Sequence, residues 1–491
     1  MASTTQPQTE FVRAISRLDA TALVVGSMIG SGIFIVSAQI LRDVHAPGLL
    51  LLVWGLSGLV TLMGALSYGE LAAMFPRAGG QYVYLREGIS PLFGYLYGWT
   101  LFVVIQTGTI AAVAVAFARF TAVLFPALAP DVFLGGTIAF PQPIGPITVG
   151  LSPQRLLAIA SVVVLTWVNV RGVKTAAFIQ TTLTAIKTAA LAALILLGLT
   201  VGRNAAAIAA NFGPDFWPAG GLTAALLPVL GAAMVGSLFS MDAWNNVGFA
   251  AGELEEPTRD LPFAMAAGVL TVTVLYLLAN VAYLHVLPAR DIASAPQDRV
   301  ATAALQVILG NAGLYVMAVA IMISTFGCNN GLILSGARVY YAMSRDDLFF
   351  RSAGALHPRY RTPAVALVVQ AVWTSMLCLS GTYSQLLEFV IFAALLFYML
   401  TAVGLFVLRL KRPGAPRPVR VPGYPWLPAA YLALNGLIAL ALLVEKTTYS
   451  GLGLLCVLLG VPVYFIWRAV TGAGGAGGAG GAQTSGSHPG A

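Results

Sequence analysis

Long apolar runs are the feature that most constrains this chain. The sequence contains about twelve stretches of roughly 20 residues with few charges, the length at which an α-helix crosses the hydrocarbon core of a bilayer. Only 9% of its residues are charged, whereas soluble domains carry about 25%. Because a backbone in lipid must satisfy its own polar groups, a helix is the expected spanning structure. We therefore predict an all-α polytopic membrane protein.

The predicted spans divide the chain into four parts. The spans are residues 18–41, 49–74, 91–125, 151–170, 175–201, 222–251, 262–286, 301–343, 363–379, 386–408, 427–444 and 452–470. The predicted parts are an N-terminal cytoplasmic segment at 1–17, a ten-span core at 18–410, two additional spans with a preceding cytoplasmic loop at 411–470, and a disordered glycine- and alanine-rich tail at 471–491.

The distribution of basic residues predicts the orientation. Most of the 26 lysines and arginines fall in short loops that share one side of the membrane when the N-terminus is cytoplasmic. The positive-inside rule then places both termini in the cytoplasm, with the protein in the inner cell membrane. Because the net charge of +8 lies in these loops, it does not indicate nucleic-acid binding. The first ten residues lack the pattern of a cleaved signal peptide.

Residues that support catalysis or metal binding do not form recognisable patterns. Cys328, Cys378 and Cys456 lie inside apolar stretches, so we expect buried thiols and neither disulfides nor metal ligands. The four histidines have no ligand spacing. The sequence offers no nucleophile–base pairing and no phosphate loop, which argues against an enzyme and against a cofactor. Energy for any transport would come from gradients or from a counter-substrate.

Two spans contain sequence that an uninterrupted helix would not favour. In the first, Gly26–Gly32 (GSMIGSG) gathers three glycines and two serines. In the sixth, Phe239–Asn246 (FSMDAWNN) places a carboxylate and two amides at membrane depth. If spans one to five and six to ten form two repeats, the second is inverted and the interruptions correspond. Paired interruptions of this kind indicate the binding site of a transporter.

The backbone groups freed by such breaks would suit a zwitterion. The half-helix that begins after Gly32 presents free N–H groups and a positive dipole end, which favour a carboxylate. Carbonyls freed near Met28 and Phe239 are suited to an ammonium group. The alternative is that the glycines form a small-residue surface for helix packing. The matching interruption in span six favours a binding site.

Further motifs follow in order along residues 18–410. They are Tyr68–Leu71 (YGEL), Phe75–Leu85 (FPRAGGQYVYL), Glu253–Pro257, Arg259–Pro262, Ser324–Gly327, Asn330–Gly331 and Gly336–Arg338. Together with Gly26–Phe34 and Met241–Asn245, this set resembles the amino acid–polyamine–organocation superfamily, and most closely its L-amino acid transporter branch. The resemblance implies a five-plus-five inverted-repeat core with broken first and sixth helices, two further helices, and alternating access around a central site.

The resemblance also implies roles for individual residues. Met28 would offer its carbonyl to the substrate amine, whereas Ser31 and Gly32 would offer amides to its carboxylate. Phe239 would be an aromatic gate, and Asn245 would couple occupancy to closure. The full set of implied substrate-binding residues is Met28, Ile29, Gly30, Ser31, Gly32, Phe239, Ser240, Asp242 and Asn245, and the implied coupling or gating residues are Lys187, Phe239 and Asn245.

Ionisable residues at membrane depth are costly and are therefore functional candidates. Lys187 matches a branch lysine whose ammonium occupies the region that sodium fills in sodium-coupled relatives, and both a coupling role and a purely structural clasp remain open. Asp242 either binds the cationic side chain of a substrate or caps freed backbone N–H groups, and we favour capping or a role in shaping the pocket. Glu70 and Glu388 are expected to reach the membrane interface. Trp244, Tyr276, Tyr283 and Gln106 are expected to pack rather than to bind.

The sequence thus predicts a secondary amino acid transporter that is sodium-independent, with exchange favoured over proton symport. The alternatives are a carrier of polyamines or other organic cations, and a non-transporting amino acid sensor, for which a soluble signalling domain would be expected. Human members of the branch bond to an accessory glycoprotein through a cysteine after span three. The loop 126–150 has no cysteine, so we expect no disulfide-linked heavy chain. The identity of the amino acid and the formation of a homodimer remain open.

Overall fold

The computed structural model describes residues 11, 13–128, 133–134, 137–140, 147–379, 383–445 and 447–475. The helices are α1 (Arg17–Met28), α2 (Gly32–Val44), α3 (Pro47–Met74), α4 (Gln81–Gly88), α5 (Pro91–Thr100), α6 (Gln106–Leu124), α7 (Pro153–Val170), α8 (Val173–Leu199), α9 (Ala205–Asn211), α10 (Leu226–Ser240), α11 (Pro257–Val286), α12 (Ala289–Ala293), α13 (Val300–Leu309), α14 (Asn311–Arg345), α15 (Ala364–Cys378), α16 (Tyr383–Lys411), α17 (Trp426–Glu445) and α18 (Thr447–Gly475).

Short elements connect these helices. A π-helical turn (Leu101–Ile105) joins α5 to α6, and β1 (Ile138–Phe140) pairs antiparallel with β2 (Ile147–Val149). Turns of 3-10 helix cover Pro126–Leu128, Pro214–Phe216, Asn246–Gly248, Ala251–Glu253, Pro296–Asp298 and Arg351–Gly354.

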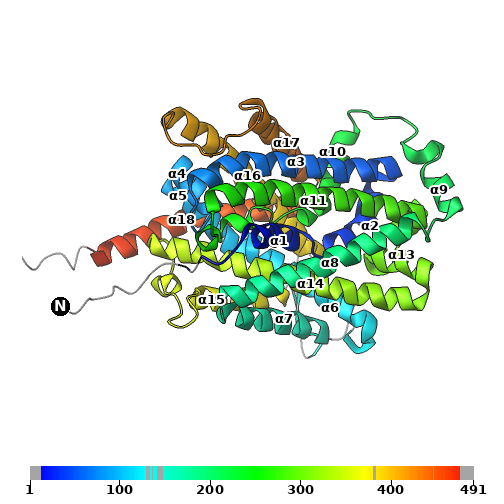
Figure 1. Cartoon of the computed structure of the whole chain (residues 1–491), viewed down its shortest axis with the longest axis horizontal. Coiled ribbons are helices and arrows are strands. Elements are labelled where there is room, and N and C mark those ends of the chain that lie inside the picture. The colour runs from blue at the N-terminus through cyan, green and yellow to red at the C-terminus, as the bar shows by residue number, and fades with distance from the viewer. Residues whose placement is uncertain are drawn as a thin grey trace, which may run out of the picture.

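The long helices run side by side along the longest axis of the molecule (Figure 1). Within the described residues, ten helical segments are long and apolar enough to cross a membrane, and one of them combines α1 and α2. The shorter apolar helices α10 and α15 stand where the sixth and ninth spans were predicted. The all-α polytopic fold with about twelve spans is therefore confirmed.

Local sequence explains where several helices begin. Ser16 caps α1, since its side chain accepts a hydrogen bond from the Asp19 N–H while the Asp19 carboxylate accepts one from Ser16. Prolines stand in the first turn of α3, α5, α7 and α11. A proline has no N–H to lose there, and its fixed φ is already helical.

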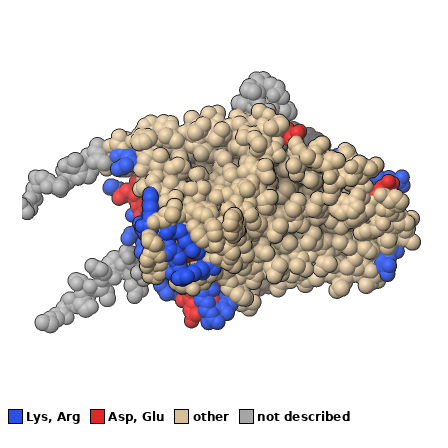
Figure 2. Space-filling model, turned by 90° about the horizontal axis from the view of Figure 1, so that it is seen from above, with Lys and Arg blue, Asp and Glu red and all other residues tan. Residues whose placement is uncertain are grey.

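The surface of the molecule has charged ends and an uncharged middle. On the face drawn in Figure 2, basic side chains gather at the end that carries α4 and α5, and a smaller charged group lies at the opposite end. Between them, large apolar side chains such as Phe178, Leu227 and Leu437 are more than 60% exposed. An apolar belt of this extent would be unfavourable in water and is suited to lipid.

Three predicted boundaries differ from the structure. The eighth span is divided into α13 and α14 at Gly310, whose φ of 64° is left-handed and ends a helix. The sixth span is α-helical only to Ser240, and 3-10 turns follow it. Helix α18 continues to Gly475, past the predicted start of the tail at 471, and residues 476–491 lie outside the described part.

The expectation for Glu70 was wrong. Its side chain is completely buried, and it accepts hydrogen bonds from Arg409 Nε (2.9 Å), Arg417 Nε (3.1 Å) and the Val421 N–H (2.9 Å). Both arginines come from the end of α16 and the loop after it, so this carboxylate anchors the loop to α3. The side chain of Glu388 lies outside the described residues.

The Glu70 ion cluster should matter for stability. We expect Glu70→Gln to lower the free energy of unfolding by about 3–5 kcal/mol, because it removes the buried carboxylate that is the counter-charge of two partly buried guanidinium groups. Glu87→Gln is the matched control, since Glu87 is partly exposed and its ion pairs with Arg86 and Arg412 contribute at most about 1 kcal/mol. Thermal unfolding in detergent measures both variants. Equal melting temperatures for the two would show that the cluster is not stabilising.

Candidate functional site

The first break separates α1 from α2 at residues 29–31. Helix α1 ends at Met28, and the Gly30 N–H turns back to donate to the Met28 carbonyl at 2.8 Å. Helix α2 begins at Gly32 without a side-chain cap on its first N–H groups. Uncapped amides at the start of a helix form a ready site for a carboxylate. The break predicted from Gly26–Gly32 is therefore present.

The second break follows α10. After Ser240 the chain turns sharply, and Ala243 adopts a left-handed φ of 68°, which is unusual for a residue with a side chain. The Asp242 N–H donates to the Phe239 carbonyl at 3.1 Å. Phe239 and Ser240 are buried. The interruption predicted in span six is also present.

The two breaks touch each other. A Cβ atom placed on Gly32 would lie 2.6 Å from Ser240 Cβ and 3.1 Å from Ser240 Cα. The Tyr276 hydroxyl on α11 lies 2.9 Å from the Met28 carbonyl and 3.2 Å from the Ser240 carbonyl. A phenol has one hydrogen to donate, so it bonds one carbonyl at a time. Tyr276 thus bridges both breaks, although its sequence context indicated only packing.

The bridge gives a direct prediction. We expect Tyr276→Phe to lower the rate of amino acid exchange about tenfold, because a buried carbonyl loses its donor at a cost of roughly 1–3 kcal/mol. Tyr315→Phe is the control, since Tyr315 on α14 is about half exposed. Uptake of a labelled amino acid into preloaded proteoliposomes measures both. Wild-type exchange by Tyr276→Phe would remove this hydroxyl from the site.

Lys187 lies beside the first break. Its side chain is 1% exposed, and the ammonium donates to the carbonyls of Gly26 and Ile29, the latter at 2.8 Å. The Ser324 carbonyl on α14 is 3.4 Å away. The lysine from α8 therefore satisfies carbonyls that the break leaves without helical partners. These are also the oxygen ligands that a small cation would need.

Helix α14 completes this side of the break. The Ser324 hydroxyl lies 3.1 Å from both the Ile29 and the Gly30 carbonyls, and Cys328 Sγ lies 3.0 Å from the Ser27 carbonyl. Ser324 belongs to a motif that the sequence singled out, but its role was not predicted. The sequence feature that pointed to Ser324 was a small hydroxyl side chain in a motif at membrane depth.

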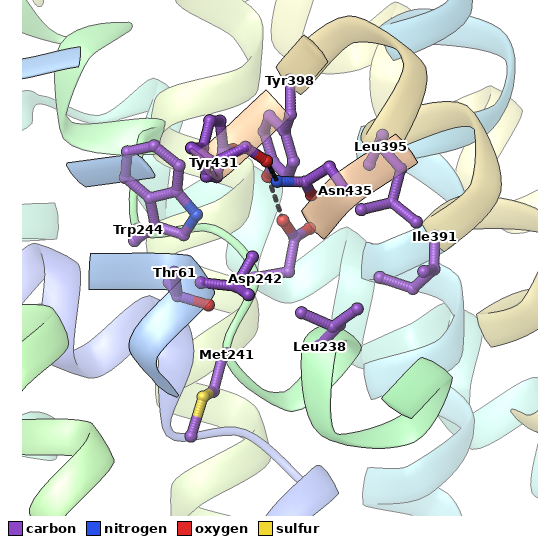
Figure 3. A pocket seen from close by; sticks show the side chains of 12 residues that line it. Thr61, Leu238, Met241, Asp242, Trp244, Ile391, Leu395, Tyr398, Tyr431 and Asn435 are labelled. Atoms are coloured by element: carbon purple, nitrogen blue, oxygen red, sulfur yellow. Dashed lines mark hydrogen bonds between the residues drawn. The ribbon is translucent and has the colours of Figure 1, made fainter. Parts of the chain in front are cut away.

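Asp242 and Asn245 bond to residues outside the first break. Asp242 accepts a hydrogen bond from the Tyr398 hydroxyl on α16 (Figure 3). Asn245 Nδ2 donates to Gln81 Oε1 at 2.7 Å, and Gln81 Nε2 donates to Thr401 at 3.0 Å. The segment after α10 is therefore tied by side chains to α4 and α16.

Asp242 also faces a small cavity. This space of about 20 Å³ is lined by residues of α3, α10, α16 and α17, among them Thr61, Tyr431 and Asn435 (Figure 3). Its volume is enough for about one water molecule. A cavity of this size, lined mostly by apolar side chains, is too small for an amino acid.

The predicted site residues thus fall into two groups. Those that lie together around the two breaks are Met28, Ile29, Gly30, Ser31, Gly32, Phe239, Ser240 and Lys187. Asp242 and Asn245 belong to the links with α16 and α4. The partners that sequence reasoning missed are Tyr276, Ser324, Gln81 and Tyr398.

Comparison with known proteins identifies the family of this chain. The family model described as amino acid permease matches residues 15–470. This chain belongs to that family. As an amino acid permease it is an amino acid transporter and not an enzyme, which confirms the predicted class.

Relatives of this permease match nearly its whole length. It is 31% identical to the serine/threonine exchanger SteT of Bacillus subtilis over 455 residues, covering 92% of this chain and 96% of the relative. It is 32% identical to the human large neutral amino acids transporter small subunit 2, covering 92% and 80%. Identity to the mouse Asc-type amino acid transporter 1 is 30%, covering 93% and 82%. The predicted branch is therefore confirmed.

Proposed function

We propose that this permease exchanges zwitterionic amino acids without sodium, by alternating access around the two breaks. The observation that carries the proposal is the Lys187 ammonium, which occupies the carbonyls of Gly26 and Ile29. A fixed cation at these oxygens removes the need for a sodium ion to hold α1 against α8 and α14. Lys187 then acts as a permanent substitute for a coupling cation.

The backbone of the breaks supplies the groups that a zwitterion needs. The substrate carboxylate accepts from the uncapped amides that begin at Ser31 and Gly32. Its ammonium takes whichever of the Met28 and Ser240 carbonyls the Tyr276 hydroxyl leaves free. Phe239 covers the site from α10. Binding of the substrate therefore rearranges a contact that already joins the two breaks.

Two further observations support the proposed exchange mechanism and the proposed orientation of the protein in the membrane. The printed name of the Bacillus relative describes an exchanger, and the chain is similar to it along 92% of its length. The concentration of basic residues at one end of the molecule supports a cytoplasmic location for both termini in the inner membrane (Figure 2).

The test is uptake into proteoliposomes that contain the purified permease. We expect labelled serine or leucine to enter at least about tenfold faster when the vesicles are preloaded with unlabelled amino acid, and replacement of sodium by choline to change nothing. A sodium requirement would overturn the proposed role of Lys187. Uptake driven by a pH gradient into empty vesicles would overturn exchange in favour of symport.

The bond between Asp242 and Tyr398 supports a shaping role for this carboxylate. We expect Asp242→Asn to lower leucine and lysine uptake by the same factor, about threefold to tenfold, because it weakens a buried link between α10 and α16. Tyr398→Phe, which removes the same bond from the other side, is the matched variant. A loss confined to lysine in Asp242→Asn would assign the carboxylate to reading a cationic side chain.

A further inference from the structure

An open groove of about 690 Å³ lies between the chain before α1 and the first turns of α8. Arg13 and Glu255 border it on one side, and Lys174, Phe178 and Thr182 on the other. The groove lies at the charged end of the molecule, next to the apolar belt. It is remote from the two breaks and contributes nothing to the site described above.

The α8 wall of the groove changes polarity with depth. Lys174, Phe178 and Thr182 follow one another at intervals of four residues, so their side chains share one face of the helix. Phe178 is 72% exposed, and the exposed Ile186 continues the apolar wall. At 1.5 Å per residue, the wall runs for about 18 Å from a cationic end to an apolar end. A phospholipid has the same gradient from headgroup to acyl chain.

Charges at the mouth of the groove are available for a ligand. Among the described residues, the side chains of Arg13, Lys174 and Glu255 take part in no ion pair, and all three are exposed. The neighbouring Asp19 is already engaged, since it accepts a hydrogen bond from Thr181 at 2.8 Å. The mouth therefore presents two cations and one carboxylate in an interfacial position.

We propose that the groove binds a phospholipid of the phosphatidylethanolamine class. Its phosphate lies between Arg13 and Lys174, where charge-assisted hydrogen bonds form. Its primary ammonium donates to Glu255, and one acyl chain lies along Phe178 and Ile186. A choline headgroup has no N–H to donate to Glu255, and an anionic glycerol headgroup leaves this carboxylate without a counter-charge.

Such a lipid would brace α1 against α8. Thr181 and Asp19, which line the groove, join these helices by a hydrogen bond, and beyond the groove Thr184 Oγ1 donates to the Ala22 carbonyl at 3.2 Å. Lys187, which clasps the first break, lies about 20 Å further along α8 from Lys174. The bound lipid thus stabilises the same helix pair that holds the break.

Native mass spectrometry of the delipidated permease tests the site, with phosphatidylethanolamine, phosphatidylcholine and phosphatidylglycerol of equal chain length as probes. We expect phosphatidylethanolamine to bind most tightly, and Arg13→Gln and Lys174→Gln each to weaken it about tenfold. Glu255→Gln should abolish the preference over phosphatidylcholine. Arg203→Gln, at an exposed arginine beyond the opposite end of α8, is the control and should change nothing.

Two results would overturn the assignment. One is equal or stronger binding of phosphatidylglycerol or phosphatidylcholine by the wild-type protein. The other is phosphatidylethanolamine affinity that Arg13→Gln and Lys174→Gln leave unchanged. Because these side chains are exposed, thermal unfolding of each variant should match the wild type, and a change in affinity then reports on the groove.

Discussion

Replacing Lys187 with alanine should abolish amino acid exchange while the permease still reaches the membrane. The ammonium is the donor for the Gly26 and Ile29 carbonyls, which the first break has left without helical partners. Without it, the Gly26 carbonyl has no donor, and the Ile29 carbonyl keeps only the Ser324 hydroxyl, which it shares with the Gly30 carbonyl. A buried acceptor without a donor costs roughly 1–3 kcal/mol. A penalty of about 3 kcal/mol on the transport-competent arrangement corresponds to a loss of about 100-fold. Counterflow of labelled serine or leucine in proteoliposomes measures it.

The matched control is Lys411→Ala, which removes an exposed ammonium at the end of α16. We expect wild-type exchange from it. Sodium makes the experiment more specific, because the Gly26 and Ile29 carbonyls that lose the ammonium are oxygen ligands of the kind that a sodium ion binds. Partial recovery of Lys187→Ala by high sodium would show that the lysine substitutes for a cation. Exchange by Lys187→Ala at the wild-type rate would remove Lys187 from the transport cycle.

The helices and both breaks were predictable from the sequence because the bilayer imposes its requirements on each segment separately. A span needs about 20 apolar residues, an ionisable residue such as Asp242 is costly inside one, and a cluster of glycines such as Gly26, Gly30 and Gly32 weakens a helix. Both signals are local. The breaks at Met28 and Ser240 therefore stand where the sequence placed them.

The partners across the site were not predictable in the same way. Whether Tyr276 packs or bonds depends on the rotation of α11 against the breaks, and the apolar residues of α11 are spread around the helix without a periodicity that specifies that rotation. The environment of Glu70 was misjudged because Arg417 belongs to a loop that folds back onto α3. Asp242 was assigned to the correct break, but its direction is set by Tyr398, 156 residues away.

Gly32→Ala should lower the rate of amino acid exchange at least tenfold, because the two breaks leave no room for a methyl group between them. The new Cβ would lie 2.6 Å from Ser240 Cβ and 3.1 Å from Ser240 Cα, so α2 and α10 must separate. Overpacking of this kind costs about 1–3 kcal/mol, and here it also displaces the amides proposed to hold the carboxylate. Gly55→Ala is the control, since a Cβ there meets nothing within 4 Å.

A second substitution separates crowding from loss of glycine flexibility. Ser240→Gly removes the clashing Cβ and hydroxyl, so that the nearest remaining atom of residue 240 is its backbone α-carbon, 3.1 Å from the new methyl group. The double variant should therefore recover much of the exchange that Gly32→Ala loses, with a coupling of about 0.5–3 kcal/mol between the two positions. If the losses simply add, the contact between the breaks does not limit transport, and Gly32 acts through its backbone alone. Recovery would establish that the two breaks function as one site.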